Sequence, residues 1–227
     1  MQTNVRWGTL GIGLAMLLCC LVASAEESVS KVESLQGSVE AIGTDGTKRK
    51  LSLGNGLRSG ERVQVGKDSR VSLRFSDGTF VQVGQNGRVM LDHYAFSKDP
   101  EESNFGMRIL QGSFRVVTGL IAKRKPQAMS VGLTVATIGI RGTDFVGEVD
   151  ETSAKVILLE PEDKDRKTAV EVSNKFGQVL IDTPGYGTEI PDQFSPPSPV
   201  RRMQLGQIQN LLRIMRPPTV PMPRGPR

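Results

Sequence analysis

The chain has 227 residues, of which 37% are hydrophobic and 5% are aromatic, and its formal net charge is +5. This length allows one domain with a hydrophobic core of its own. From Ser195 onward the chain has six arginines and no acid, whereas residues 26–194 carry 22 basic and 24 acidic side chains. The body is therefore nearly neutral and has no basic stripe, which argues against nucleic acid as a partner.

Residues 1–25 have the order of a secretory signal: a positive charge at Arg6, an apolar block over residues 7–22 and small residues ending at Ala25. This order predicts cleavage after Ala25 and an exported protein, periplasmic or extracellular, of the bacterial cell envelope. The alternatives are an uncleaved membrane anchor and lipid attachment at one of the two adjacent cysteines. Both cysteines leave with the signal, so we expect no disulfide and no cysteine metal site in the mature chain.

The body alternates apolar and polar residues with period two, in short valine-rich runs that end at turn-forming residues. The clearest runs are ERVQVG (61–66), RVSLRF (70–75), TFVQVG (79–84) and RVMLDH (88–93). We also expect strands over residues 32–42, 107–117, 133–138, 144–149, 155–159, 169–172 and 177–181. Asp77 and Gly78 favour a tight hairpin, and residues 97–104 are expected to form a loop. Helix signals are almost absent before residue 200, so the pattern predicts an all-β domain.

One unit of this pattern occurs twice. VQVGKDSRVSL, from Val63, matches VQVGQNGRVML, from Val81, at a shift of eighteen residues. We interpret the unit as a strand, a turn and a returning strand. Such a unit cannot bury its apolar face alone, so stacked neighbours or a facing sheet must cover it. The repeat therefore predicts one domain of short antiparallel strands and hairpins in a sandwich-like or solenoid-like arrangement.

The segment VATIGIRGTDFVGEV places Arg141 between Gly139 and Gly142 in an otherwise apolar run. A phosphate-binding loop would lead into a helix, but this segment leads into another valine-rich strand. We expect the two glycines to permit a bend or bulge. A buried, unpaired guanidinium is costly, so Arg141 should bond carbonyls or a carboxylate, with Asp144 or Asp77 as candidates. The alternative is that Arg141 faces an anionic ligand or a partner's acid.

No catalytic constellation is evident in the sequence. His93 is the only histidine, and no Gly-x-Ser-x-Gly turn or second metal ligand accompanies it. Asp77 and Asp182 resemble the paired acids of aspartic proteases only weakly, and both fit turn chemistry better. We therefore expect no catalytic residue, no cofactor and no metal site.

The C-terminal part differs from the body. Residues 195–200 form a proline-rich linker, residues 201–216 an amphipathic helix, and residues 217–227 a basic tail that we expect to be disordered. The helix either docks onto its own β domain or binds elsewhere, by inserting its apolar stripe into a partner's groove or by lying on an anionic membrane surface. The residues expected to make such an external contact are Arg201, Arg202, Leu205, Ile208, Leu212 and Met215.

Several motifs, taken in order, resemble those of the FecR domain family. They are a Gly-x-Val opening strand, a Leu-x-x-Gly-Glu-x-Val turn, a Leu-x-Phe-x-Asp-Gly-Thr hairpin and a late Arg-Gly-Thr-x-Phe. They fall on Gly37 and Val39; on Leu57, Gly60, Glu61 and Val63; on Leu73, Phe75, Asp77, Gly78 and Thr79; and on Arg141, Gly142, Thr143 and Phe145. The resemblance covers roughly residues 31–189 and implies a FecR-like β domain at residues 26–194. We expect its signature residues Gly60, Asp77, Gly78, Arg141, Gly142, Thr143 and Phe145 to be structural.

The resemblance also implies a role. The family is named for the periplasmic part of iron-citrate sensing regulators, which relay a signal from an outer-membrane receptor to a cytoplasmic sigma factor. Here a secretory signal stands where those regulators carry a cytoplasmic region, so we expect a free-standing exported module. We predict non-enzymatic interaction, signalling or scaffolding with a protein or envelope polymer. The alternatives are a small envelope hydrolase with paired carboxylates and a carbohydrate-binding module, which would need exposed aromatic platforms that the mature chain largely lacks.

Overall fold

The computed structural model describes residues 28–142, 144–161 and 168–215. The predicted signal at residues 1–25, Thr143 and the predicted tail at residues 217–227 lie outside the described residues. Within them the chain is mostly β, with seventeen strands and one longer helix near its C-terminal end. The all-β prediction is confirmed.

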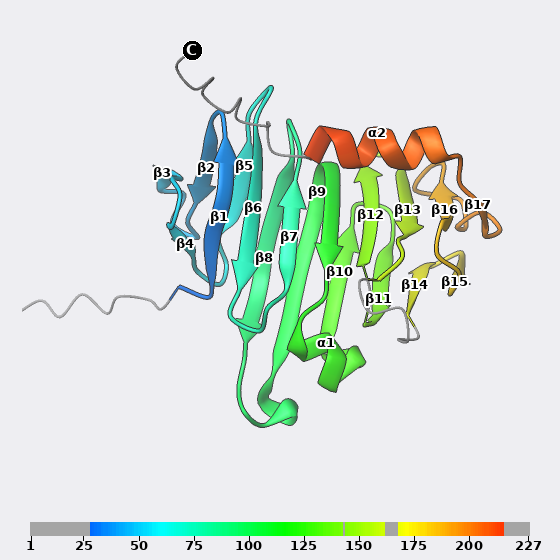
Figure 1. Ribbon diagram of the computed structural model, residues 1–227, viewed down its shortest axis with the longest axis horizontal. Helices are drawn as coiled ribbons and strands as arrows, with labels where there is room; N and C mark the ends of the chain where they lie inside the picture. Colours follow the sequence, from blue (N-terminus) through cyan, green and yellow to red (C-terminus); the bar gives the residue numbers. More distant parts are fainter. Residues whose placement is uncertain (1–27, 143, 162–167, 216–227) are drawn as a thin grey trace, which may run out of the picture.

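The strands form two layers that share one strand, β9 (Asn104–Val117) (Figure 1). The first sheet has the order β4 (Gly56–Leu57), β1 (Ser30–Gln36), β6 (Arg70–Phe75), β7 (Phe80–Val83), the end of β9, β12 (Asp144–Val149), β13 (Ala154–Leu158), β16 (Tyr186–Ile190) and β17 (Arg201–Arg202). The second sheet has the order β3 (Lys48–Lys50), β2 (Val39–Ile42), β5 (Arg62–Val65), β8 (Arg88–Ala95), the start of β9, β10 (Met129–Leu133), β11 (Thr137–Arg141), β14 (Ala169–Asn174) and β15 (Gly177–Ile181). All of these pairs are antiparallel except β9 with β10.

The core lies between the two sheets and follows from the period-two pattern. In β5, Val63 and Val65 are buried while Arg62 and Gln64 are exposed. The same alternation in the other strands joins residues of both sheets into one hydrophobic cluster. Burying one face of each sheet against the other supplies the main stabilising free energy of such a sandwich.

The repeat was predicted to be a strand, a turn and a returning strand, but the structure shows a different arrangement. In each copy the chain leaves one sheet and enters the other, since β5 is in the second sheet and β6 in the first, while β7 is in the first and β8 in the second. The turns hold Asp68 at φ 54° and Asn86 at φ 56°, the two positive-φ residues other than glycine among those described. Short polar side chains tolerate this left-handed conformation best. Each copy of the repeat therefore contributes one strand to each of the two facing sheets. The facing sheet that was predicted to cover the repeat thus contains strands of the repeat itself.

The chain also crosses between the two sheets at two glycines, one on either side of the repeat. Gly37, at φ 76°, separates β1 from β2, and Gly112, at φ 97°, lies where β9 passes from the second sheet to the first. The expected single strand at residues 32–42 is therefore wrong. A β-carbon at Gly37 would overlap Ser69 of the neighbouring crossing. The crossings thus pack in a row along one end of the sandwich.

The other strand predictions mostly agree with the structure. The expected strands at residues 70–75, 144–149 and 177–181 coincide with β6, β12 and β15. The strand expected at residues 133–138 is wrong, because the turn between β10 and β11 lies there. Strands β3, β4, β10, β16 and β17 were not predicted. Strand β17 lies at residues 201–202, where the helix predicted at residues 201–216 was expected to begin; the helix begins at Leu205. The loop expected at residues 97–104 is found at residues 97–103, with one turn of 3-10 helix, η1 (Pro100–Glu102), and β9 begins at Asn104.

Helix α2 (Leu205–Met215) lies across the outer face of the first sheet (Figure 1). Leu211 is buried against Val146 of β12 and Ile157 of β13, with Ile208 and Leu212 beside it. This contact explains why β12 and β13 are apolar on both faces, a pattern typical of strands that are covered on both sides. Of the two alternatives for the helix, docking onto its own domain is the one that the structure shows.

The proline-rich segment before α2 is extended, as expected, but it is held along β16. Ser198 N–H donates to the Glu189 carbonyl at 2.9 Å, and the Thr188 hydroxyl donates to the Ser198 carbonyl at 2.7 Å. The segment therefore continues the β layer instead of forming a free spacer. Among the helices of the described ranges, none has the length and apolar character needed to span a membrane.

Candidate functional site

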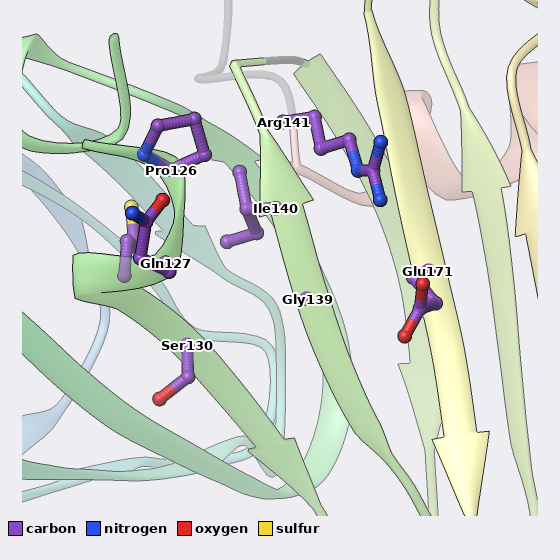
Figure 2. A pocket seen from close by; sticks show the side chains of 8 residues that line it. Pro126, Gln127, Ser130, Gly139, Ile140, Arg141 and Glu171 are labelled. Atoms are coloured by element: carbon purple, nitrogen blue, oxygen red, sulfur yellow. The ribbon is translucent and has the colours of Figure 1, made fainter. Parts of the chain in front are cut away.

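A hollow of about 500 Å³ lies on the outer face of the second sheet (Figure 2). Its walls come from β10, β11, β14 and the 3-10 turn η2 (Pro126–Ala128), and its lining residues are Pro126, Gln127, Met129, Ser130, Gly139, Ile140, Arg141 and Glu171. The nearest atom to a β-carbon added at Gly139 would be the Glu171 β-carbon, at 3.8 Å. That is an ordinary contact, so packing does not require glycine here, and its lack of a side chain keeps the hollow open.

Arg141 and Glu171 are the charged groups of this hollow. In β11 the side chains of Ile138 and Ile140 point into the core, so Arg141, at the end of the strand, points outward and is exposed. Glu171 of β14 lies directly opposite Gly139, which places it diagonally across from Arg141. No ion pair joins either residue to another group within the ranges that the structure describes.

The predicted carboxylate partners of Arg141 are wrong. Asp144 is buried in the first sheet and forms a bidentate ion pair with Arg115, with Nη2 and Oδ2 2.6 Å apart. Asp77 also has other partners. The physical reason is strand alternation. It turns the Arg141 side chain toward solvent at the end of β11, whereas the chain then passes into the first sheet, where the Asp144 side chain pairs with Arg115.

The glycines beside Arg141 have different roles. Gly142, at φ 64°, forms the corner between β11 in the second sheet and β12 in the first, as the bend prediction requires. Gly139 makes no bulge, because β11 pairs with β14 in unbroken register. Phe145 is fully buried and meets the Phe114 ring edge-on at 6.2 Å between centroids.

Asp77 is the centre of a buried hydrogen-bond network. Its carboxylate accepts from the Thr79 N–H at 3.0 Å, the Thr79 hydroxyl at 2.7 Å and the Ile121 N–H at 3.2 Å. The Tyr94 hydroxyl accepts from the Asp77 N–H at 2.8 Å, and Thr79 Oγ1 accepts from the Gly119 N–H at 3.0 Å. Burial, and secondly the charge of Asp77, raise the pKa of Tyr94 to about 12. The network ties the β6–β7 turn to the start of α1 (Leu120–Arg124).

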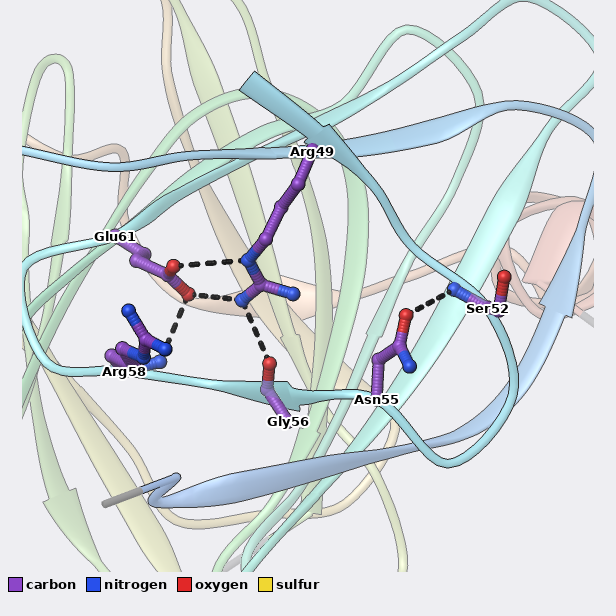
Figure 3. Close-up of polar contacts among 6 residues, drawn as sticks. All are labelled: Arg49, Ser52, Asn55, Gly56, Arg58 and Glu61. Carbon is purple, nitrogen blue, oxygen red and sulfur yellow. Dashed lines mark hydrogen bonds and ion pairs between the residues drawn. The ribbon is translucent and has the colours of Figure 1, made fainter. Parts of the chain in front are cut away.

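Glu61 forms a second internal clamp (Figure 3). Its buried carboxylate accepts from Arg49 Nη2 at 2.6 Å and from the Arg58 N–H at 2.9 Å, and Arg49 also donates to the Gly56 carbonyl at 2.8 Å. Gly60, at φ 83°, makes the turn that brings Glu61 to this position. Glu61, the acid of the Leu-x-x-Gly-Glu motif, is therefore engaged within the fold.

The acids and the histidine considered for catalysis do not form a site. Asp182 is exposed after β15 at one end of the sandwich, whereas Asp77 lies between β6 and β7, several strands away in the sheet order. The ring of His93 lies over Gly106 of β9, where a β-carbon would overlap it. No group of three or more potential metal ligands occurs among the residues that the structure describes.

The residues predicted for an external contact of the tail differ in their exposure, because the helix is docked on the first sheet. Arg201 pairs with Glu189 at 2.6 Å, Arg202 is exposed, and Leu205 is 70% exposed. Ile208 and Leu212 pack against the first sheet, while the side chain of Met215 lies outside the described residues. Leu211, which is 4% exposed, was missed, although it lies at the i+3 position from Ile208.

Comparison with protein families shows that residues 61–176 match the FecR protein family. The match covers half of the chain and extends from Glu61, through the Asp77 network and Arg141, to Phe176. The chain belongs to the FecR family. The resemblance of the motifs is thereby confirmed, and the hollow with Arg141 and Glu171 lies inside the FecR region.

Solved structures show where else this fold occurs. Two crystal structures of a Parabacteroides distasonis protein assigned to the anti-sigma factors match with a TM-score of 0.50 and 12% identity. They cover 66% of this FecR-family chain and 63% or 64% of the matched protein, so this chain spans less than two thirds of that protein. At this identity the likeness concerns the fold alone. A cell surface anchoring domain matches 28% of this chain and 84% of its own length at 33% identity, with a TM-score of 0.28. No curated protein matches the chain.

Proposed function

We propose that this FecR-family chain is a non-enzymatic module of the bacterial cell envelope, which binds a protein or an envelope polymer through the outer face of its second sheet. The observation that carries the proposal is the hollow in which Arg141 and Glu171 lie, both without an ion-pair partner among the described residues. Other prominent charged residues of the FecR region, such as Asp77, Glu61 and Asp144, are committed to internal contacts. Available charge beside an open hollow suits a ligand that carries complementary groups.

The envelope hydrolase is the less favoured alternative. Acid-pair catalysis needs two carboxyl groups at one cleft, close enough to share protons or a substrate. Asp77 is buried under hydrogen bonds from Thr79 and Ile121, and Asp182 lies on a different part of the fold. A carbohydrate-binding role would need aromatic platforms, whereas none of the described residues that line the hollow is aromatic.

The C-terminal helix fits a supporting role better than a detachable one. Its release would expose Val146 and Ile157 on the first sheet, at a hydrophobic cost of about 1.5–3 kcal/mol for each side chain. Arg202 and Leu205 are exposed and remain the residues through which the tail would contact a protein or an anionic membrane surface. In this proposal the hollow makes the first contact and the tail a second one.

A signalling role agrees with the family. The regulators for which FecR is named pass a signal across the envelope, and the matched Parabacteroides distasonis protein is assigned to the anti-sigma factors. We propose that this chain, exported after cleavage following Ala25, receives or holds an envelope partner in a comparable regulatory step. Intact-mass measurement of the protein recovered from the envelope fraction tests the cleavage.

Affinity capture from an envelope extract tests the binding surface. The mature protein, Arg141→Glu and Glu171→Lys would serve as baits, with Arg62→Glu as the matched control because Arg62 is an exposed arginine on the same sheet. We expect both hollow variants to lose the captured species while the control keeps it, with unchanged thermal unfolding. Equal capture by all four baits would contradict the proposal. Hydrolysis of envelope material that is lost in Asp77→Asn would favour the enzyme alternative.

A further inference from the structure

The outer face of the second sheet carries a glycine on each of three neighbouring strands. Gly106 of β9, Gly132 of β10 and Gly139 of β11 point outward, because the residues on either side of each glycine are buried in the core. A glycine inside a strand often marks a place where another backbone or a ligand approaches closely. The side chains around each glycine show which of the three is available for such an approach.

Two of these glycines are covered by side chains of adjacent strands. A β-carbon added at Gly106 would lie 2.1 Å from Cε1 of His93, so the histidine ring occupies the space above this glycine. A β-carbon added at Gly132 would lie 2.9 Å from Cγ of Arg108. Asp92 holds the Arg108 side chain, with Nη2 and Oδ1 2.6 Å apart. Neither position is therefore open to a second backbone.

Gly139 is uncovered. The nearest atom to an added β-carbon would be the Glu171 β-carbon, at 3.8 Å, and the hollow of about 500 Å³ lies at this position. Figure 2 shows β11 passing between Ser130 and Gln127 on one side and Glu171 on the other. Ser130 and Gln127 are exposed, and their hydroxyl and amide groups can donate and accept hydrogen bonds, as a peptide backbone requires. The open glycine thus lies among groups that can bind a backbone.

The two charges beside Gly139 have a spacing that an extended chain reproduces. Arg141 lies diagonally across the β11–β14 pair from Glu171, because Glu171 is directly opposite Gly139. Diagonal neighbours in an antiparallel pair are about 7–8 Å apart. In an extended chain, side chains two residues apart point the same way and are separated by about 6.5 Å. An acid and a base at two such positions would therefore reach Arg141 and Glu171 together.

We propose that the hollow binds an extended segment of a partner protein in which an acidic and a basic residue are two positions apart. This binding mode rests on the proposed function, since it names the class of partner for the same hollow. The acid of the segment pairs with Arg141, the base pairs with Glu171, and the backbone between them lies against Gly139. Both pairs are charge-assisted hydrogen bonds, which are stronger than those between neutral groups.

The charges of the hollow favour a protein segment as the occupant. A polyanionic envelope polymer would be repelled by Glu171, and a neutral glycan offers no charge complementary to Arg141 or Glu171. The described lining residues also include no aromatic side chain on which a sugar ring could stack. A protein segment supplies both signs of charge at the required spacing.

Titration of the mature protein with synthetic peptides, followed through the amide resonances of Ser130 and Gly139, tests this binding mode. The probe is acetylated and amidated Ser-Ala-Glu-Thr-Lys-Ala-Ser. Its control is Ser-Ala-Glu-Lys-Thr-Ala-Ser, which places the same two charges on opposite sides of an extended chain. We expect the probe to bind at least about tenfold more tightly than the control peptide, because only the probe presents both charges to the hollow. Equal affinities, or no shift of these resonances at the highest soluble probe concentration, would overturn the proposal.

A double-mutant cycle tests which charges pair. Arg141→Gln should lower the affinity for the probe, and replacing the glutamate of the probe by glutamine should then cause little further loss. The same is expected for Glu171→Gln and the lysine of the probe. Arg62→Gln is the matched control, since Arg62 is an exposed arginine on the same sheet, and it should leave the affinity unchanged. Fully additive losses for Arg141 and the glutamate would contradict the assigned contact.

Gly139→Ala separates recognition from folding. Its methyl group should hold the partner backbone away from the sheet and lower the affinity for the probe several-fold. Thermal unfolding should stay unchanged, because the methyl group meets its nearest neighbour at an ordinary contact distance. Wild-type affinity in this variant would contradict a backbone lying on Gly139.

Envelope capture and peptide titration can fail separately. Capture that is lost in Arg141→Glu, together with a probe that does not bind, would leave the hollow as a recognition surface and overturn the protein segment as its ligand. Capture that is equal for all baits would overturn the proposed function as well.

Discussion

Asp77 joins three parts of the chain that are far apart in the sequence: the β6–β7 turn, Tyr94 of β8 and the first turn of α1. Its carboxylate is buried, and each of its hydrogen bonds is to a backbone N–H or a hydroxyl group. A buried carboxylate must be satisfied in this way, because an unpaired one would cost several kcal/mol. At the scale of single residues, the acids Asp77 and Glu61 of the family motifs are engaged inside the fold, and we propose that Arg141 and Glu171 serve recognition.

Tyr94 gives this network a measurable pH dependence. Its pKa is raised to about 12 in the folded state, from about 10 in an unfolded chain. Below pH 10 the hydroxyl is protonated in both states, so it contributes no pH dependence. Between these two values the unfolded chain releases a proton that the folded chain keeps, and the free energy of unfolding falls as the pH rises.

We therefore expect the free energy of unfolding, measured with urea at a series of pH values, to decrease more steeply with pH above 10 in the wild type than in Tyr94→Phe. The variant should be less stable at neutral pH by about 1–3 kcal/mol, because the Asp77 N–H loses its acceptor. Identical pH slopes in the two proteins would contradict this account of the Tyr94 environment.

At the scale of elements, the crossings between sheets depend on particular backbone conformations. Gly37→Ala should reduce the free energy of unfolding by more than about 1–2 kcal/mol, because φ is 76° there and the new methyl group would overlap Ser69. Gly139→Ala is the matched control, since its φ is not positive and its nearest contact is at 3.8 Å. We expect the control to unfold within about 0.5 kcal/mol of the wild type. Equal losses in the two variants would contradict the crossing described here.

Two leucines of the docked helix α2 differ in burial and should differ in their contribution to the free energy of unfolding. Leu211 is 4% exposed and Leu205 is 70% exposed. Leu211→Ala should lower the free energy of unfolding by about 2–3 kcal/mol, whereas Leu205→Ala should change it by less than about 0.5 kcal/mol. Chemical denaturation of both variants measures the difference. Similar small effects would indicate that α2 does not remain on the first sheet in solution.

The sequence predicted the individual strands well and their connections poorly. The predicted bounds of β6, β12 and β15 agree with the structure. Strand β15 alternates between a buried and an exposed face, whereas β12 was found from its apolar run between glycines, because it is covered on both faces. The crossing at Gly37 could not be predicted, because a glycine inside a valine-rich run is equally consistent with a bulge and with a change of sheet. The short edge strands β3 and β17 carry no apolar pattern, since they bury little surface.

The candidate site was predicted only in part. The position of Arg141 between two glycines marked it as a candidate residue. Internal partners were expected for it, whereas the alternation of side chains along β11 turns it toward solvent. Glu171 was missed, because its relation to Arg141 arises from the pairing of β11 with β14 across an intervening change of sheet. A long-range pairing of this kind leaves no local signal in a single sequence.

At the scale of the whole molecule, the fold is a two-layer β sandwich with one layer covered by α2 and the other bearing the hollow. Helix α2 covers part of the outer face of the first sheet, at β12 and β13, and we propose the outer face of the second sheet, which bears the hollow, as the recognition surface. The family match and the position of the hollow within it both support recognition by the FecR domain itself.

The most direct test of this account compares the hollow with the tail in envelope capture by the mature protein. Gly139→Trp would fill the hollow without changing a charge, and a double variant, Arg202→Ala with Leu205→Ala, would remove the exposed residues of the tail. We predict that Gly139→Trp loses the captured partner and keeps its thermal unfolding, while the tail variant retains most of the capture. Capture that survives in Gly139→Trp and disappears in the tail variant would contradict the central claim.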